Sequence, residues 1–258
     1  MTTRRFLLIG IDGVRFDRLQ TTPTPNIDAV AARGFLHAAQ IPPHNPTMSG
    51  AQWATILTGV WSDQHGIRRN WRRSRKLERF PDLLQLVEAE HPEADVFAAV
   101  SWPPLAIRAG CGPVLRTPTY LPRRRVSTLS SWVRSDEAVV DHAVERLADP
   151  AVTAGFVYLG QVDIAGHLID TGPRYVEALE HADALVGRML AALDATGDRD
   201  SWTVMITTDH GHRDKGGHGT RTDAETTVWF ACDTKLPGWD RLDSAGVPAY
   251  LLRTLSES

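Results

Sequence analysis

Cysteine is scarce in this chain of 258 residues, which contains only Cys111 and Cys232. Neither belongs to a CxxC pair, so the pattern argues against a disulfide framework and against a zinc site built from thiolates. Long apolar runs are also missing. The run at residues 6–11 meets Asp12 at once, and it is too short for a signal peptide or for the roughly 18 residues of a membrane span. We therefore expect a cytoplasmic protein that does not bind a membrane.

A strong net charge is absent as well. The chain has 28 lysines and arginines against 31 aspartates and glutamates, a formal net charge of −3. No overall positive field therefore indicates a nucleic acid polymer as partner. Basic residues are nevertheless concentrated in one segment, at Arg68, Arg69, Arg72, Arg73, Arg75, Lys76 and Arg79. Such charge runs are most often solvated faces, and the sequence assigns neither a role to this one nor an oligomeric state to the chain.

Three apolar, partly β-branched segments each run into an aspartate, at residues 6–12, 156–163 and 202–209. Continuous apolar runs of this length are typical of strands buried on both faces, as in parallel sheets. Helices are expected between them at 25–33, 80–90, 135–148 and 173–195, and further strands at 93–100 and 227–232. This alternation predicts an α/β fold, a three-layer α/β/α sandwich with a mostly parallel central sheet. The length suits a single domain over residues 1–258.

Carboxylates and imidazoles gather where these segments end, and ligands of such sheets bind beyond the carboxyl ends of the strands. Asp163 and His167 are four residues apart, which places both on one side of a helical turn. Any one of these residues alone has an ordinary explanation, because an aspartate there often caps a helix. Together they suit zinc, manganese or iron, and they are too many for one catalytic zinc with its about three protein ligands. The candidates for a site of two ions are Asp12, Asp163, His167, Asp209, His210 and His218, with His212 doubtful because Gly211 could turn it away.

Four ordered motifs resemble the nucleotide pyrophosphatase/phosphodiesterase family of the alkaline phosphatase superfamily. They are IGIDGVRFD around Asp12, DxxGH from Asp163 to His167, TTDHGH around Asp209 and GGHG around His218. The resemblance extends from Leu8 to Gly219, and the motifs occur in the same order as in the family. It implies one metal ion held by Asp163, His167 and His218. It implies a second held by Asp12, Asp209, His210 and the hydroxyl oxygen of Ser49.

The resemblance also identifies the nucleophile. Family members carry it ten residues before the glycine of a Thr-Gly pair, here Gly59, which points to Ser49. Asn70, which would bind a phosphoryl oxygen, follows Ser49 by 21 residues, which is the family spacing. Thr47 and Thr55 are the competitors, and they fit these counts less well. One departure concerns specificity, because the nucleotide hydrolases place an aromatic residue directly after the nucleophile and this chain has Gly50.

The resemblance therefore implies a metal-dependent hydrolase of phosphoester bonds that forms a phosphoseryl intermediate on Ser49. The expected cofactors are two divalent ions, with zinc favoured and manganese as the alternative. The expected substrate is a small phosphorylated molecule. Asn70 favours a phosphodiester, a pyrophosphate or a phosphonate monoester, because a neutral hydrogen-bond donor suits a phosphoryl group with one negative charge fewer than a phosphomonoester dianion. The alternatives are a phosphomonoesterase of the same superfamily, which Arg68 and Arg69 could serve, and a metal-binding module without catalysis.

Overall fold

One mixed sheet organises the computed structural model, which describes residues 4–123, 126–239 and 241–256. The strands lie in the order β2-β7-β6-β1-β5-β3-β4. The pairs that β7 forms with β2 and β6 are antiparallel, and the other described pairs are parallel. The bounds are β1 (Arg5–Ile11), β2 (Phe35–Gln40), β3 (Asp95–Val100), β4 (Thr119–Tyr120), β5 (Val152–Leu159), β6 (Trp202–Thr207) and β7 (Thr227–Cys232). The mostly parallel sheet predicted from the sequence is confirmed.

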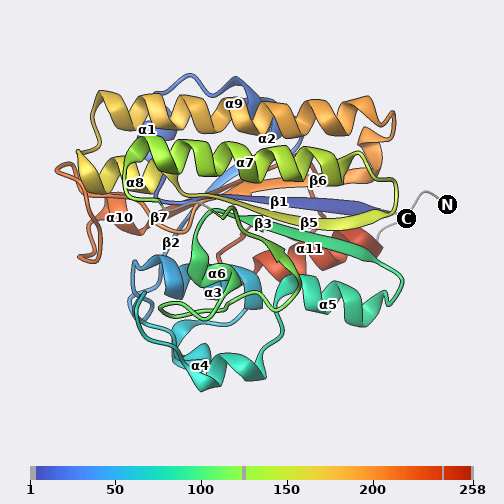
Figure 1. The fold of residues 1–258 in the computed structure, drawn as a ribbon, viewed down its shortest axis with the longest axis horizontal. Coiled ribbons are helices and arrows are strands. Elements are labelled where there is room, and N and C mark those ends of the chain that lie inside the picture. Colours follow the sequence, from blue (N-terminus) through green and yellow to red (C-terminus); the bar gives the residue numbers. More distant parts are fainter. Residues whose placement is uncertain (1–3, 124–125, 240, 257–258) are drawn as a thin grey trace.

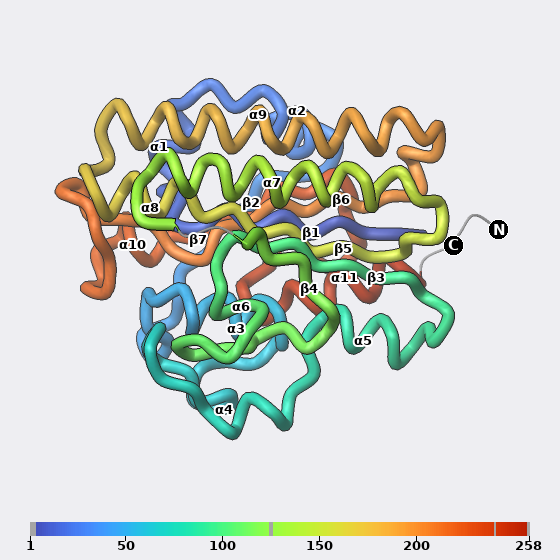
Figure 2. The backbone as a smooth tube through the Cα atoms, viewed as in Figure 1, coloured from blue at the N-terminus to red at the C-terminus, as the bar shows by residue number. Residues whose placement is uncertain are grey.

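Helices cover both faces of this sheet, as the ribbon and the tube show (Figure 1, Figure 2). On one face lie α1 (Phe16–Leu19), α2 (Pro25–Arg33), α7 (Leu129–Leu147), α8 (Gln161–Leu168) and α9 (Pro173–Ala195). On the other lie α3 (Ser49–Thr58), α4 (Ser62–His65), α5 (Leu83–Glu90), α6 (Pro103–Ala106) and α11 (Val247–Ser256). The short elements η1 (Arg75–Arg79), η2 (Arg199–Ser201) and α10 (Asp223–Thr226) complete the chain. Within the described ranges, no helix is both long enough and apolar enough to cross a bilayer.

Alternation along β1 divides the core in two. Leu7, Ile9 and Ile11 belong to the cluster that includes residues of α2, α7 and α9. Phe6 and Leu8 belong to the cluster on the opposite face, with residues of α3, α5 and α11. Because side chains of a strand point alternately to its two faces, the six-residue apolar run serves both clusters. This explains why it shows no polar interruption before Asp12.

The helix bounds agree with the predictions where end signals are strong. α2 and α9 begin at Pro25 and Pro173 and end where predicted, since proline suits the first helical turn. The prediction for α5 is three residues too early, because Asp82 caps the helix with a capping box and Leu83 is its first residue. The prediction for α7 is six residues too late, since the helix begins at Leu129 after a capping box between Thr128 and Ser131.

The prediction for residues 156–163 is wrong in one respect. β5 ends at Leu159, and α8 begins at Gln161. The buried carboxylate of Asp136 accepts hydrogen bonds from the backbone N–H groups of Gly160 (3.1 Å) and Gln161 (2.9 Å), which fixes this turn. Asp163 therefore lies in the first turn of a helix and not at the end of a strand.

Candidate metal centre and active site

Asp12 directly follows β1 and is fully buried. Its Oδ2 accepts hydrogen bonds from the indole Nε1–H of Trp53 (2.8 Å) and the hydroxyl of Tyr158 (2.6 Å). Gly10 makes room for this indole, since a Cβ there would lie 2.3 Å from the Trp53 ring. The other oxygen, Oδ1, is buried and has no hydrogen-bond partner among the described residues. The carboxylate is thus held rigidly with one acceptor left over.

Asp209 and His210 complete a first group of ligands with Asp12. The Gly13 N–H donates to Asp209 Oδ1 (3.1 Å), while Asp209 Oδ2 is buried without a partner. His210 Nδ1 pairs with the Gly211 carbonyl at 3.1 Å, so Nδ1 carries the proton and Nε2 presents a lone pair. His210 Nε2 lies 3.6 Å from Asp12 Oδ1 and 3.2 Å from Asp209 Oδ2. Three acceptors therefore converge on one point.

Asp163, His167 and His218 form a second group. Their ligand atoms lie within 4.8 Å of one another, as do those of the first group. The His167 and His218 Nε2 atoms are 3.4 Å and 3.7 Å from Asp163 Oδ1. His218 Nδ1 pairs with the carbonyl of Thr47 at 2.6 Å, which again leaves Nε2 as the free acceptor. The rings of His210 and His218 stack with centroids 3.8 Å apart, so the two groups adjoin.

The two carboxylates of the first group lack a positive charge to balance them. Burial raises the pKa of Asp12 well above its usual value, and the nearby charge of Asp163 raises it further. Burial likewise raises the pKa of Asp209, with repulsion from Asp12 and Asp163 added. Burial lowers the pKa of His210, so its imidazole is neutral and does not balance these charges. Two buried carboxylate oxygens that face a neutral imidazole nitrogen fit the donor set that a divalent cation requires.

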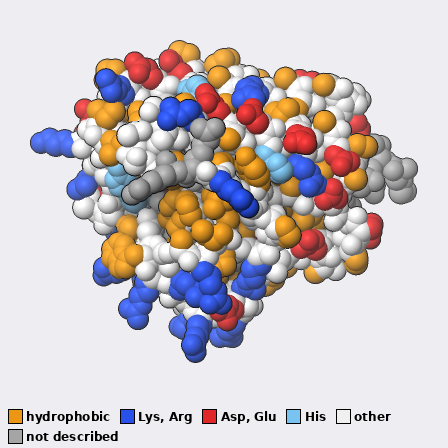
Figure 3. Space-filling view, in the orientation of Figure 1, with side chains coloured by type: hydrophobic (Ala, Val, Ile, Leu, Met, Phe, Trp, Pro, Cys, Tyr) orange, Lys and Arg blue, Asp and Glu red, His pale blue; other side chains and the backbone are white. Residues whose placement is uncertain are grey.

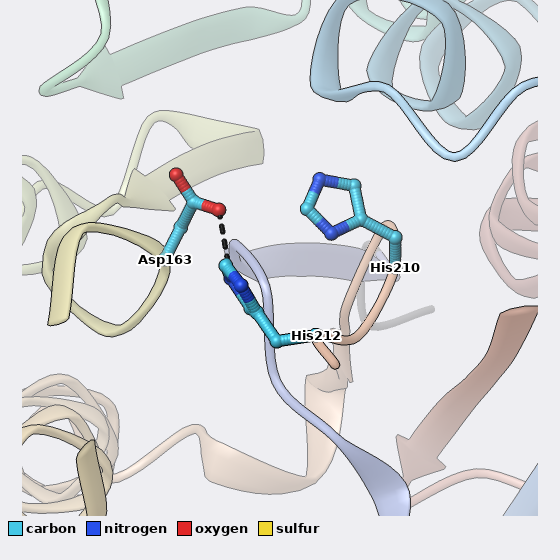
Figure 4. A group of neighbouring side chains, drawn as sticks. All are labelled: Asp163, His210 and His212. Atoms are coloured by element: carbon cyan, nitrogen blue, oxygen red, sulfur yellow. Dashed lines mark hydrogen bonds and ion pairs between the residues drawn. The ribbon is translucent and has the colours of Figure 1, made fainter. Parts of the chain in front are cut away.

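His212, doubtful on the sequence, lies inside this site. It is fully buried, and its Nε2 lies 2.9 Å from Asp163 Oδ1 (Figure 4). Burial alone would raise the pKa of Asp163, but the hydrogen bond and charge of His212 hold it below its usual value. Gly166 and Gly13 leave room for this ring, because a Cβ at either position would lie within 2.8 Å of it. Gly211 does not turn His212 away from the site.

Ser49 is the first residue of α3 and is nearly buried. Its Oγ lies 3.3 Å from His210 Nε2 and does not cap the helix, since Met48 occupies the cap position without a side-chain bond. Asn70 lies beside it, and the Gly50 N–H donates to Asn70 Oδ1 (2.8 Å). This bond fixes the amide of Asn70 so that its NH₂ group is free to donate elsewhere.

The two competitors of Ser49 lie differently. The hydroxyl of Thr55 donates to the Ala51 carbonyl (3.0 Å) and pairs with His65 Nε2 (3.2 Å), on the second turn of the helix. The Thr47 hydroxyl is buried without a partner, and its backbone carbonyl holds His218. Ser49 is therefore the one of the three whose hydroxyl contacts a residue of either ligand group.

With this geometry established, the chain can be compared with known proteins. The model of the type I phosphodiesterase / nucleotide pyrophosphatase family matches residues 6–223. The chain belongs to this family. It is 23% identical to human ectonucleotide pyrophosphatase/phosphodiesterase family member 7 over 218 residues, 80% of this chain and 47% of that protein.

Solved structures show the same fold. Human ectonucleotide pyrophosphatase/phosphodiesterase 5 matches 99% of this chain and 96% of its own, with a TM-score of 0.72 and 14% identity. A 2-O GAG sulfatase matches 100% of this chain and 71% of its own, with a TM-score of 0.73 and 16% identity. The chain spans about half the length of the curated relatives it matches. The family match and the solved structures thus agree on the family and the fold of this chain.

Proposed function

We propose that this chain is a two-metal hydrolase of phosphoester bonds that works through a phosphoseryl intermediate on Ser49. The observation that carries the proposal is the pair of adjoining ligand groups, with unpaired buried oxygens on Asp12 and Asp209 and the Ser49 hydroxyl beside His210. Membership of the phosphodiesterase family supports it.

One ion would be held by Asp12, Asp209, His210 and Ser49 Oγ, and the other by Asp163, His167 and His218. Zinc fits this set of carboxylates and imidazoles, and manganese is the alternative. When bound, the two cations would lower the pKa of a coordinated hydroxyl and neutralise negative charge that develops on phosphorus and on the leaving oxygen.

The reaction then has two displacements. Ser49 Oγ, ionised, attacks phosphorus in line, the phosphorus–oxygen bond to the leaving group breaks, and the phosphoryl group is held on Ser49. Water attacks from the side the leaving group vacated, and the bond to Ser49 Oγ breaks. Two inversions predict net retention of configuration at phosphorus. The position of Ser49 at the start of a ten-residue helix favours the bound negative charge throughout.

Asn70 donates to a non-bridging oxygen, where charge accumulates in the transition state. Its amide is neutral, which suits a diester, a pyrophosphate or a phosphonate monoester better than a monoester dianion. The adjacent arginines make contacts of their own: Arg68 donates to the His44 carbonyl (3.3 Å), and Arg69 lies over the Trp71 ring at 5.4 Å. Both guanidinium groups keep further N–H donors, so the preference for a diester depends on the neutral amide of Asn70.

A substrate panel tests the reaction class. Zinc-loaded protein should hydrolyse bis-p-nitrophenyl phosphate and p-nitrophenyl phenylphosphonate with a higher kcat/KM than p-nitrophenyl phosphate. Acid quenching during turnover, followed by peptide mass spectrometry, should find the phosphoryl group on Ser49. Ser49→Ala should lose the adduct and several orders of magnitude in kcat, whereas Thr47→Ala should still carry the adduct at Ser49. A phosphopeptide that maps to Thr47, or inversion with a chiral phosphorothioate, would contradict the scheme.

Two other functions find less support in the residues. A sulfatase needs a cysteine or serine in a C/S-x-P-x-R setting, and the segment that starts at Ser49 reads SGAQW. A module that binds metal without catalysis would have no use for a serine hydroxyl beside the ligands. Zinc binding without turnover of any substrate in the panel would favour that module.

A further inference from the structure

Charge is divided unevenly over the molecule. The segment 68–79 carries seven basic residues and one acidic residue, a net charge of +6, so the rest of the chain, with a total of −3, carries −9. In the space-filling view, lysine and arginine side chains gather at the lower end of the molecule, where α4 and the segment after it lie in Figure 1 (Figure 3). The proposed mechanism uses none of these side chains.

This basic end contains a pocket of about 190 Å³ between η1 and the loop at residues 108–116. Three arginines contribute to its wall, and Glu78 is the only acidic residue among the described residues that line it. We name it the arginine pocket after Arg73, Arg108 and Arg116. None of the proposed metal ligands lines it, so it is separate from the metal centre.

The three guanidinium groups differ in how far they are engaged. Arg116 is anchored, because one of its terminal nitrogens donates to the carbonyls of Leu77 (2.6 Å) and Phe80 (3.2 Å). Arg73 makes a long ion pair of 3.7 Å with Glu78, in which both side chains are exposed, so this contact contributes little. Arg108 is exposed and makes no hydrogen bond or ion pair with the described residues. The pocket thus has one fixed cation and two that are available to a ligand.

The inner side of the pocket lies against the active site. Cys111 lines the pocket, is buried, and donates its backbone N–H to the Asn70 carbonyl (2.8 Å). Its Sγ lies 2.6 Å from where a Cβ on Gly50 would be. The same side chain therefore fills the place where an aromatic residue would begin after Ser49. The loop thus separates the arginine pocket from the residues that would hold the substrate.

We propose that the arginine pocket binds a phosphate group other than the one that is hydrolysed. Planar guanidinium groups form paired hydrogen bonds with phosphate oxygens, and several arginines around one pocket balance a dianion that a single cation does not. The phosphate can be carried by a soluble phosphorylated molecule or by the headgroup of an anionic lipid, since both present the same group to the pocket.

Binding of inorganic phosphate to the zinc-loaded protein at low ionic strength tests this site. Arg108→Gln and Arg73→Gln should each bind one phosphate fewer than the wild type does, or bind that phosphate at least about tenfold more weakly. Arg174→Gln, which removes one exposed arginine from α9, is the matched control and should bind phosphate as the wild type does. Phosphate held at the metal centre would remain in all four proteins. Unchanged binding in both pocket variants would overturn the proposal.

A second arm distinguishes the two sources. Vesicles of phosphatidylcholine with and without phosphatidic acid are sedimented with the same four proteins. Binding that requires phosphatidic acid and is lost in Arg108→Gln supports a lipid headgroup. Loss of inorganic phosphate binding in Arg108→Gln, with no vesicle binding by the wild type, supports a soluble ligand.

Discussion

The hydroxyl of Tyr158 offers a selective perturbation of one of the two ligand groups. It donates to Asp12 Oδ2 at 2.6 Å, and no residue of the Asp163 group is its hydrogen-bond partner. Tyr158→Phe removes one oxygen and leaves the Trp53 N–H as the remaining donor to that oxygen. The carboxylate can then rotate, and its free oxygen is no longer held toward Asp209 and His210. Zinc should therefore bind more weakly at the Asp12 group and unchanged at the Asp163 group.

The size of the effect follows from burial. Tyr158 and Asp12 are both buried, and a hydrogen bond to a charged group contributes about 1.5–3 kcal/mol. Loss of a partner that orients a metal ligand typically weakens metal affinity by about 10–100-fold. We expect the dissociation constant of one zinc ion to rise within that range and kcat to fall with it at limiting zinc.

Competition against a chromophoric chelator measures both zinc affinities. The control is Tyr250→Phe, since Tyr250 is also a buried tyrosine whose hydroxyl makes two hydrogen bonds, with the Thr234 carbonyl (2.6 Å) and the Leu236 N–H (3.1 Å). That variant should lose stability without a change in zinc affinity. If Tyr158→Phe weakened both sites equally, or neither, Asp12 would not be a ligand oriented by Tyr158.

Three further predictions concern single residues. Asn70→Asp keeps the acceptor for the Gly50 N–H and replaces the donor, so kcat/KM for a diester should fall by about 10²–10³ with the fold intact; a loss below tenfold would remove Asn70 from the mechanism. Burial lowers the pKa of His65 from 6.5 to about 4. The unfolded chain therefore binds the proton more tightly, and stability is lost as the pH falls below 6.5, by roughly 2–3 kcal/mol at pH 4.5. Urea unfolding at pH 7 and 4.5 should show a smaller acid loss in His65→Gln, and an equal loss would contradict the assignment. His212→Phe should weaken zinc at the Asp163 group by about tenfold or more in the chelator assay, and unchanged affinity would make His212 a packing residue only.

Much of the fold can be predicted from clear patterns in the sequence. β1 is apolar from Phe6 to Ile11, β6 is a buried and mostly apolar strand, and α2 and α9 begin with proline. β2 has no such signal, because it is a half-exposed edge strand whose residues are mostly of intermediate burial. The start of α7 was missed because a serine takes the place of the usual glutamate or glutamine in its capping box.

Some residues of the candidate site could likewise be predicted from the sequence, and others could not. The ligand residues stand in short motifs, and the fold brings all of Asp12, Asp163, His167, Asp209, His210 and His218 into two adjoining groups. The residues that orient them have no such signature. Trp53 and Tyr158 are aromatic residues of α3 and β5 whose polar atoms meet Asp12 only when α3 packs on the face of the sheet to which the Tyr158 side chain belongs. His212 stands in the TTDHGH motif, but the sequence does not show that it faces the carboxylate of Asp163.

Anomalous scattering at the zinc edge from a crystal grown with zinc tests the two-metal centre most directly. The account predicts two peaks, one bounded by Asp12, Asp209 and His210 and the other by Asp163, His167 and His218, with Ser49 Oγ next to the first. A single peak shared by both groups, or two peaks with another side chain in the place of Ser49, would contradict it.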